Sequence, residues 1–224
     1  ICGARKVSEE ILLGQESLAP ALKVMLLLGA ASLLPAILLS VTSFVRIIVV
    51  LSLLRQGLGA AQTPPTQVIV GLALFLTAFT MGPVYDEVKD VAIAPLQREE
   101  VTEMEAFQAA ILPIERFMLR QTREQDLAMF YEFTGEALPE QPEDVPMRLA
   151  LPAFILSELT TAFQMGVIVI LPFLVVDLAV ASLLMSMGMM MVPPTMMSLP
   201  SKLLLFVLVD GWTLVAGSLL RSFA

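Results

Sequence analysis

The chain has 224 residues, of which 57% are hydrophobic and 15% are charged, and its mean hydropathy is +0.84. Soluble globular chains contain about 45–50% apolar and about 25% charged residues, so a membrane or a large assembly must cover the surplus apolar surface. The sequence has no histidine and one cysteine, Cys2, which excludes histidine-based catalysis, thiolate metal clusters and an internal disulfide. The formal charge of −8 argues against a nucleic-acid-binding protein, because such proteins present basic surfaces.

Charge is concentrated in one stretch, residues 86–148, which contains fifteen of the 21 acidic and six of the 13 basic residues. We expect this stretch to form an acidic, helical insert outside the membrane. The remaining sequence is close to neutral and overwhelmingly apolar. The predicted organisation is an N-terminal segment over 1–23, a first hydrophobic helical hairpin over 24–85, the insert over 86–148, and a second hydrophobic hairpin over 149–224.

The first hairpin is predicted from two apolar runs separated by a turn. Residues 24–45 carry no charge and are long enough to cross a bilayer; Arg46 then interrupts a run that continues to position 54. As one helix, residues 24–54 would be about 46 Å long, against a hydrocarbon core of about 30 Å, with a kink at Pro35. A Gly- and Pro-rich turn leads to a second apolar helix over 68–81.

The insert carries its own helix signals. Thr122 and Gln125 match a capping box that would open a helix ending at Gly135. Arginines also repeat at helical spacing on one face of the insert, at Arg116, Arg120 and Arg123. The favoured interpretation is a solvated face paired with Glu115 and Glu124, and the alternative is a partner-binding surface.

The second hairpin is predicted from uncharged runs over 159–176 and 178–201, with Asp177 between them. Its tip would be segment 185–197, which holds seven of the 14 methionines. Methionine fills irregular gaps and re-packs easily. The segment is therefore either soft filler at a crowded helix turn or a deformable seal, in which several copies around an axis close a channel and yield to a passing chain. A copper-binding thioether cluster is disfavoured, because neither histidine nor a nearby cysteine supports it.

Four charges interrupt the apolar runs: Arg46, Glu158, Asp177 and Asp210. A charge facing lipid at bilayer depth costs at least about 2.5–3.5 kcal/mol, so such groups usually face protein or water. The favoured interpretation is that they pair with one another or across subunits and hold the helices in register. The alternative is a proton or ion path, which would need several acids on one helical face or a histidine relay, and the sequence shows neither.

Orientation follows from Arg55 and Lys202, which flank the two predicted hairpin turns. The positive-inside tendency places them on the cytoplasmic side and leaves the insert outside. The chain begins with Ile1 rather than methionine, which suggests processing or truncation upstream. No glycine-rich phosphate-binding motif is present, so energy for any transport must come from elsewhere.

Several strings of residues resemble one known family when taken together and in order over residues 24–223. In the first half these are Thr42-Ser-Phe-Val-Arg46-Ile-Ile-Val, Pro64-Pro-Thr-Gln-Val68, Gly71-Leu-Ala-Leu-Phe-Leu-Thr77 and Phe117-Met-Leu-Arg-Gln-Thr-Arg-Glu124. In the second half they are Ser157-Glu-Leu, Thr161-Ala-Phe-Gln164, Leu171-Pro-Phe-Leu, Met187-Gly-Met-Met-Met-Val-Pro-Pro194 and Phe206-Val-Leu-Val-Asp-Gly-Trp212. They resemble the FliP/SctR family of type III secretion export-gate proteins, and the string from Phe117 is more similar to the flagellar branch.

The resemblance implies an all-α, non-enzymatic subunit of the flagellar type III export apparatus, in the bacterial inner membrane at the basal body. In this family five FliP subunits join FliQ and FliR in an oligomeric, membrane-associated export gate, together with other export membrane proteins and lipid. Unfolded flagellar subunits pass through it, driven by proton motive force and an associated ATPase. No cofactor, metal, nucleic acid or catalytic residue is implied, and the insert would lie on the periplasmic side.

The resemblance also assigns roles to residues. It implies a methionine ring that closes the pore, formed by Met187, Met189, Met190 and Met191. It implies intersubunit or buried charge contacts at Arg46, Glu158, Asp177, Lys202 and Asp210.

Three positions depart from the family pattern: Thr66, Thr160 and Ser201. The change at Thr160 removes a charge next to Glu158, which leaves the partner of that acid undetermined by the sequence. Three alternatives to the flagellar gate stay open. They are a virulence-type (SctR) gate, a structural membrane scaffold, and a small ion or solute transporter that uses Glu158, Asp177 and Asp210.

Overall fold

A computed structural model describes residues 20, 22, 24–29, 31–33, 35–59, 63–137, 139, 144–189 and 191–223. Most of the predicted N-terminal segment 1–23 and Met190 lie outside these described residues. The all-α prediction is confirmed, because the regular elements of the described ranges are helices, with no strand among them. The chain divides into two compact units, Ile1–Leu39 and Ser40–Ala224.

The first unit contains most of a helix that spans Val24–Ser40. Its described side chains are largely exposed apolar groups, such as Met25, Leu26 and Ile37. The helix continues through Pro35, where the sequence predicted a kink within one long helix.

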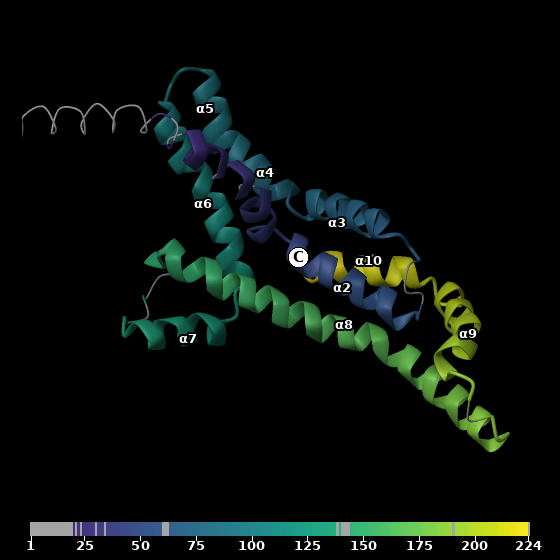
Figure 1. Cartoon of the computed structure of the whole chain (residues 1–224). Coiled ribbons are helices and arrows are strands. Elements are labelled where there is room, and N and C mark those ends of the chain that lie inside the picture. Colours follow the sequence, from purple (N-terminus) through teal and green to yellow (C-terminus); the bar gives the residue numbers. More distant parts are fainter. Residues whose placement is uncertain are drawn as a thin grey trace, which may run out of the picture. The chain divides into compact units, whose positions relative to one another are not determined.

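The second unit contains the remaining elements, shown in Figure 1. In chain order they are α2 (Phe44–Gly57), α3 (Thr66–Thr80), α4 (Gly82–Val88), the π-helical turn η1 (Lys89–Ile93), α5 (Ala94–Gln97), α6 (Glu103–Gln121), α7 (Glu124–Thr134), α8 (Met147–Ser186), α9 (Pro194–Leu208) and α10 (Gly211–Arg221).

The predicted single helix over 24–54 is wrong, because a turn at Val41–Ser43 separates α2 from the preceding helix. The hydroxyl of Thr42 accepts a hydrogen bond from the Phe44 amide at 3.3 Å. The hydroxyl of Ser43 is fully buried and pairs with that of Thr80 on α3. Serine and threonine side chains that bond locally compete with the helical pattern, which accounts for the break at this point.

The main core of the second unit lies where α2, α3, α8, α9 and α10 meet. Its buried members include Ile47 and Leu51 of α2, Ala73 of α3, Phe173 of α8 and Leu219 of α10. Helix α2 lies directly along α8 (Figure 1), and glycine makes this approach possible. A methyl group added at Gly166 of α8 would lie 2.2 Å from Leu53 Cδ1 of α2.

The insert helices pack against the N-terminal half of α8. Phe117 of α6 meets Phe154 of α8 edge to face, with their ring centroids 6.1 Å apart, and Met118 beside it is fully buried. Tyr131 of α7 packs with Leu149 of α8 in a third, smaller cluster. The insert is therefore joined to α8 through two apolar clusters.

Of the two helix ends that the sequence predicted in the insert, the structure confirms one. Gly135 ends α7 in the left-handed conformation, with φ +69°, as predicted. The predicted capping box at Thr122 is wrong, because the Thr122 hydroxyl donates back to the Met118 carbonyl instead. The capping box that forms joins Thr102 and Glu105 at the start of α6. The Thr102 amide donates to Glu105 and holds the pKa of that exposed carboxyl below its ordinary value.

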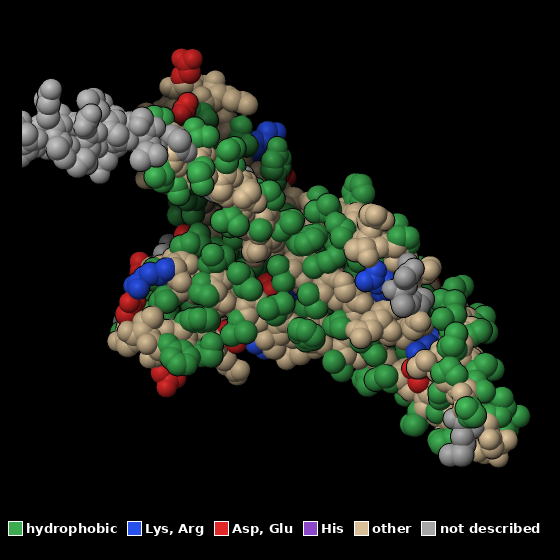
Figure 2. Space-filling model, viewed as in Figure 1, with side chains coloured by type: hydrophobic (Ala, Val, Ile, Leu, Met, Phe, Trp, Pro, Cys, Tyr) green, Lys and Arg blue, Asp and Glu red, His purple; other side chains and the backbone are tan. Residues whose placement is uncertain are grey.

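Apolar side chains cover much of the outer surface. Figure 2 shows them spread along the second unit, and exposed examples lie on α3, α8 and α9, among them Phe75, Ile168 and Val207. Of the described helices, α8, with 40 residues, is long and apolar enough to cross a membrane by itself. Three bent pairs also qualify if each pair counts as one span: Val24–Ser40 with Phe44–Gly57, Thr66–Thr80 with Gly82–Gln97 (bent by 55°), and Pro194–Leu208 with Gly211–Arg221 (bent by 63°).

The close packing of α2 on α8 predicts different effects at two glycines. Gly166 and Gly71 both lie inside helices, so alanine gains about 1 kcal/mol of helix propensity at either position. A methyl group at Gly166 meets Leu53, whereas at Gly71 nothing lies within 4 Å. We expect Gly166→Ala to lower the free energy of unfolding by about 1–3 kcal/mol relative to Gly71→Ala, measured by chemical unfolding in detergent. Equal values for the two variants would contradict this packing.

Candidate functional site

A buried ion pair joins α2 to α8. The side chain of Arg46 is 3% exposed and that of Glu158 is fully buried. The Arg46 Nε donates to Glu158 Oε2 at 3.0 Å, and Nη2 donates to Oε1, so the contact is bidentate. Bidentate arginine–carboxylate pairs are among the stronger charge-assisted contacts in proteins.

The remaining donors of Arg46 reach two further parts of the chain. Its Nη1 donates to the backbone oxygen of Ser222 at 2.8 Å and to the Ser222 hydroxyl at 3.0 Å. Its Nη2 donates to Gln121 Oε1 of α6 at 3.1 Å, and the ring centroid of Phe223 lies 4.0 Å from the guanidinium carbon. We call these five residues (Arg46, Gln121, Glu158, Ser222 and Phe223) the Arg46 cluster. It brings α2, α6, α8 and the residues after α10 to one point.

A second ion pair, between a buried lysine and a partly buried aspartate, lies toward the other end of α8. Lys202 of α9 is 2% exposed, and its Nζ donates to Asp177 Oδ2 at 2.7 Å and to the Gly57 carbonyl at 3.0 Å. The Ser198 hydroxyl donates to the other oxygen of Asp177 at 2.5 Å. These four residues form the Lys202 cluster, which joins the end of α2, α8 and α9.

A third polar group fixes the start of α7 on α8. Arg123 and Asp126 form a two-point contact, with Nε to Oδ2 at 2.8 Å and Nη2 to Oδ1 at 3.1 Å. The Ser157 hydroxyl donates to Asp126 at 2.5 Å and accepts from the Arg123 amide at 3.0 Å. Burial raises the pKa of Asp126, but hydrogen bonds from Arg123 and Ser157 and the charge of Arg123 outweigh it. The pKa therefore lies below its ordinary value of 3.8.

The structure brings together four of the five charges that the sequence singled out. Arg46 pairs with Glu158 and Lys202 pairs with Asp177, each within one chain. Asp210 is exposed at the turn between α9 and α10, with φ +51° and no capping hydrogen bond from its side chain.

The partner of Glu158 that the sequence left undetermined is therefore Arg46. The Thr160 hydroxyl donates to the Leu156 carbonyl of its own helix and leaves that pair intact. Sequence reasoning missed the contacts of Gln121, Ser198 and Ser222, because an uncharged polar side chain does not stand out from the sequence around it. The sequence analysis also paired the insert arginines with Glu115 and Glu124, whereas Nη1 of Arg116 lies 2.6 Å from Oε1 of Glu87.

The methionine segment lies at the end of α8. The helix ends at Ser186, Gly188 turns the chain with φ +76°, and Pro193 precedes α9. Of the predicted ring residues, Met187 and Met191 are strongly exposed, at 71% and 98%, and Met189 is 39% exposed. Met190 lies outside the described residues. Met187 and Met191 therefore have little contact within their own chain, whereas Met189 is partly covered.

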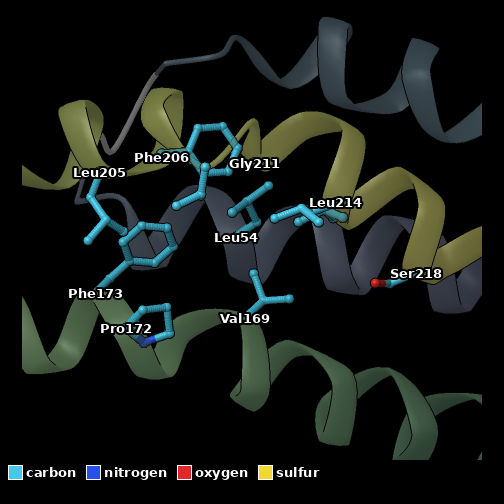
Figure 3. A pocket seen from close by; sticks show the side chains of 11 residues that line it. Leu54, Val169, Pro172, Phe173, Leu205, Phe206, Gly211, Leu214 and Ser218 are labelled. Atoms are coloured by element: carbon cyan, nitrogen blue, oxygen red, sulfur yellow. The ribbon is translucent and has the colours of Figure 1, made fainter.

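An apolar pocket of about 180 Å³ opens between α8 and the bent α9–α10 pair (Figure 3). Pro172 and Phe173 line it from α8, Phe206 from α9 and Leu214 from α10, while Ser218 is a polar member. No charged side chain lines this pocket. Among the described residues, no three His, Cys, Asp or Glu side chains gather as metal ligands would.

Comparison with known proteins settles the family. The model of the FliP family matches residues 27–219 of the chain. This chain belongs to the FliP family. It is 52% identical to flagellar biosynthetic protein FliP of Pectobacterium carotovorum subsp. carotovorum, over 94% of this chain and 81% of the relative. The protein of the same name from Bacillus subtilis is 49% identical over 93% of this chain and 94% of the relative. That of Aquifex aeolicus is 44% identical over 96% of this chain and 90% of the relative. The resemblance seen in the sequence strings is therefore confirmed.

The Arg46 cluster predicts a large loss of stability when its cation is removed. Arg46→Ala leaves Glu158 buried without its counter-ion, which typically costs about 3–5 kcal/mol. Arg116→Ala is the matched control, because it breaks an ion pair whose side chains are 51% and 34% exposed and whose worth is at most about 1 kcal/mol. Chemical unfolding in detergent compares the two variants. A loss at Arg46 no larger than at Arg116 would contradict this assignment.

The Asp126 contact predicts a pH dependence. Because its pKa is lower in the folded chain than in the unfolded one, ionised Asp126 contributes stability that is present in full above pH 3.8 and is lost as the pH falls through the folded pKa. We expect the stability advantage of the wild type over Asp126→Asn to shrink on acidification below pH 3.8. Thermal unfolding across a pH series measures it. A difference that stays constant or widens would overturn the prediction.

Proposed function

We propose that the chain is a core subunit of the flagellar type III protein export apparatus. Five copies would assemble with FliQ and FliR into the export gate through which unfolded flagellar proteins cross the inner membrane. The observation that carries the proposal is membership of the FliP family over residues 27–219, with relatives named for flagellar biosynthesis at 44–52% identity. The relatives' names favour the flagellar branch over a virulence-type gate. The role is structural and not enzymatic.

The outer surface supports an assembly. Large apolar side chains on α3, α8 and α9 are exposed in the single chain, among them Phe75, Phe79 and Leu178. Monomeric soluble proteins rarely expose contiguous apolar patches larger than a few hundred Å², so lipid, other copies of the chain and other export membrane proteins would cover these faces. On this proposal the insert around α6 and α7 lies on the periplasmic side.

The charge clusters support a gate subunit rather than a transporter. A path through Glu158, Asp177 and Asp210 would need acids free to take up and release a cation. Glu158 and Asp177 are instead held by Arg46 and Lys202, and they lie about 28 Å apart along α8 at 1.5 Å per residue. The four paired charges would keep each subunit's helices in place. Asp210, which is exposed, is then the charge we assign to a contact between subunits.

We assign the pore seal to Met187, Met189, Met190 and Met191. The described members project from the turn between α8 and α9 with large exposed fractions. Flexible thioether side chains from several copies would fill an irregular opening and re-pack as a chain passes. Alanine at the same positions is too short to meet across an axis.

The seal predicts a leak in the resting gate. We expect replacement of Met189, Met190 and Met191 with alanine to let small solutes cross the membrane while the complex still assembles. Met104→Ala is the control, because Met104 is 67% exposed but lies on α6 in the insert. Solute flux into cells or vesicles that contain the assembled complex measures the leak. A membrane as tight as that of the Met104→Ala control would count against the seal.

A further inference from the structure

The described methionines of this chain differ widely in how much of their surface is exposed. Met118 of α6 is fully buried in the cluster with Phe117 and Phe154. The described methionines of segment 185–197 are instead between 39% and 98% exposed: Met185, Met187, Met189, Met191, Met196 and Met197. We call these six the loop methionines. They lie at the end of α8 remote from α7 (Figure 1).

An exposed thioether is open to two-electron oxidation, and its susceptibility follows exposure. Attack of the sulfur on hydrogen peroxide breaks the O–O bond and forms an S–O bond. The sulfur loses two electrons, one peroxide oxygen becomes the sulfoxide oxygen, and the other leaves as water. The product is polar and chiral, and it can be reduced back enzymatically. The loop methionines therefore concentrate a reversible chemistry in one short segment.

The consequence depends on what the loop methionines do. A thioether packs against apolar neighbours, whereas a sulfoxide accepts hydrogen bonds from water and disfavours a dry contact. Met191 is 98% exposed and therefore has almost no packing within its own chain to lose. Oxidation of Met191 should accordingly leave the fold of the subunit intact and act on contacts between the loops of different copies.

We propose that the loop methionines are a site of reversible oxidation by peroxides, and that sulfoxide formation loosens the closed export gate. This inference rests on the proposed function, in which the loop seals the pore. In the closed gate, peroxide would reach the loop methionines from the water on either side of the seal. The leak of small solutes through the closed gate would then depend on the peroxide concentration around it.

The modification itself is tested on the assembled complex in detergent. Limited hydrogen peroxide is added, and mass spectrometry of its peptides then locates the added oxygen. We expect oxygen on the loop methionines well before Met118, which serves as the internal buried standard. Oxidation of Met118 at the same rate as the loop, or a loop that resists peroxide, would overturn the proposal.

The effect on the gate is tested by solute leak in vesicles that contain the complex. Peroxide should raise the leak of the wild type toward that of the triple alanine variant, and methionine sulfoxide reductase with its reductant should restore the barrier. A variant with leucine at every methionine of 185–197 keeps the apolar bulk but cannot be oxidised, so its leak should not respond. Met104→Leu, which removes an exposed methionine of the insert, should respond like the wild type.

The outcomes separate this inference from the proposed function. If the alanine variant leaks but the oxidised wild type does not, the seal stands and the oxidation switch is wrong. If the leucine variant responds to peroxide like the wild type, the site lies elsewhere and the proposal fails. If neither the alanine variant nor the oxidised protein leaks, the seal fails and the inference fails with it.

Discussion

The buried pair of Arg46 and Glu158 is the constraint on which the rest of the subunit depends. Taking two charges out of water costs several kcal/mol per ion, and their attraction offsets this only when every remaining donor is satisfied. Gln121 and Ser222 supply those acceptors, and Phe223 covers the guanidinium. Helices α2, α6 and α8 and the residues after α10 must therefore meet at one place. Moving α2 or α8 away would leave a buried charge without its counter-ion, and moving α6 or the residues after α10 away would remove acceptors of the Arg46 guanidinium.

The Lys202 cluster repeats this logic toward the other end of α8, where Asp177 and Ser198 hold α9 against the end of α2. Between the two clusters α8 carries no charge, and much of its outer face is apolar and exposed. Ion pairs within the chain thus hold the helices of the second unit together. Its exposed apolar faces are free to contact lipid or neighbouring subunits, and exposed methionines lie at one end of α8. That division fits the proposed gate, in which the helices would stay in place while the thioethers re-pack around a passing chain.

The sequence predicted what depends on composition and local pattern. The surplus of apolar residues indicated a membrane-associated helical protein, and charges at Arg46, Glu158 and Asp177 stood out because burying them is costly. The sequence did not predict which groups these charged side chains contact. Arg46 and Ser222 are 176 positions apart, and no local pattern links them. Length alone also suggested one helix over 24–54, whereas hydrogen bonding by Thr42 and Ser43 breaks it. The methionine segment was visible as a cluster, but only the fold shows it at the exposed end of α8.

The most direct test of the account is the native mass of the complex extracted in mild detergent from cells that express the chain with its neighbouring export membrane proteins. A closed ring of five copies contributes about 122 kDa, five times the 24.3 kDa of one chain, before partners are added. We predict a particle at least that large that contains several copies of the chain. A stable monomer or dimer without partners would contradict the gate and would require another explanation for the exposed apolar faces.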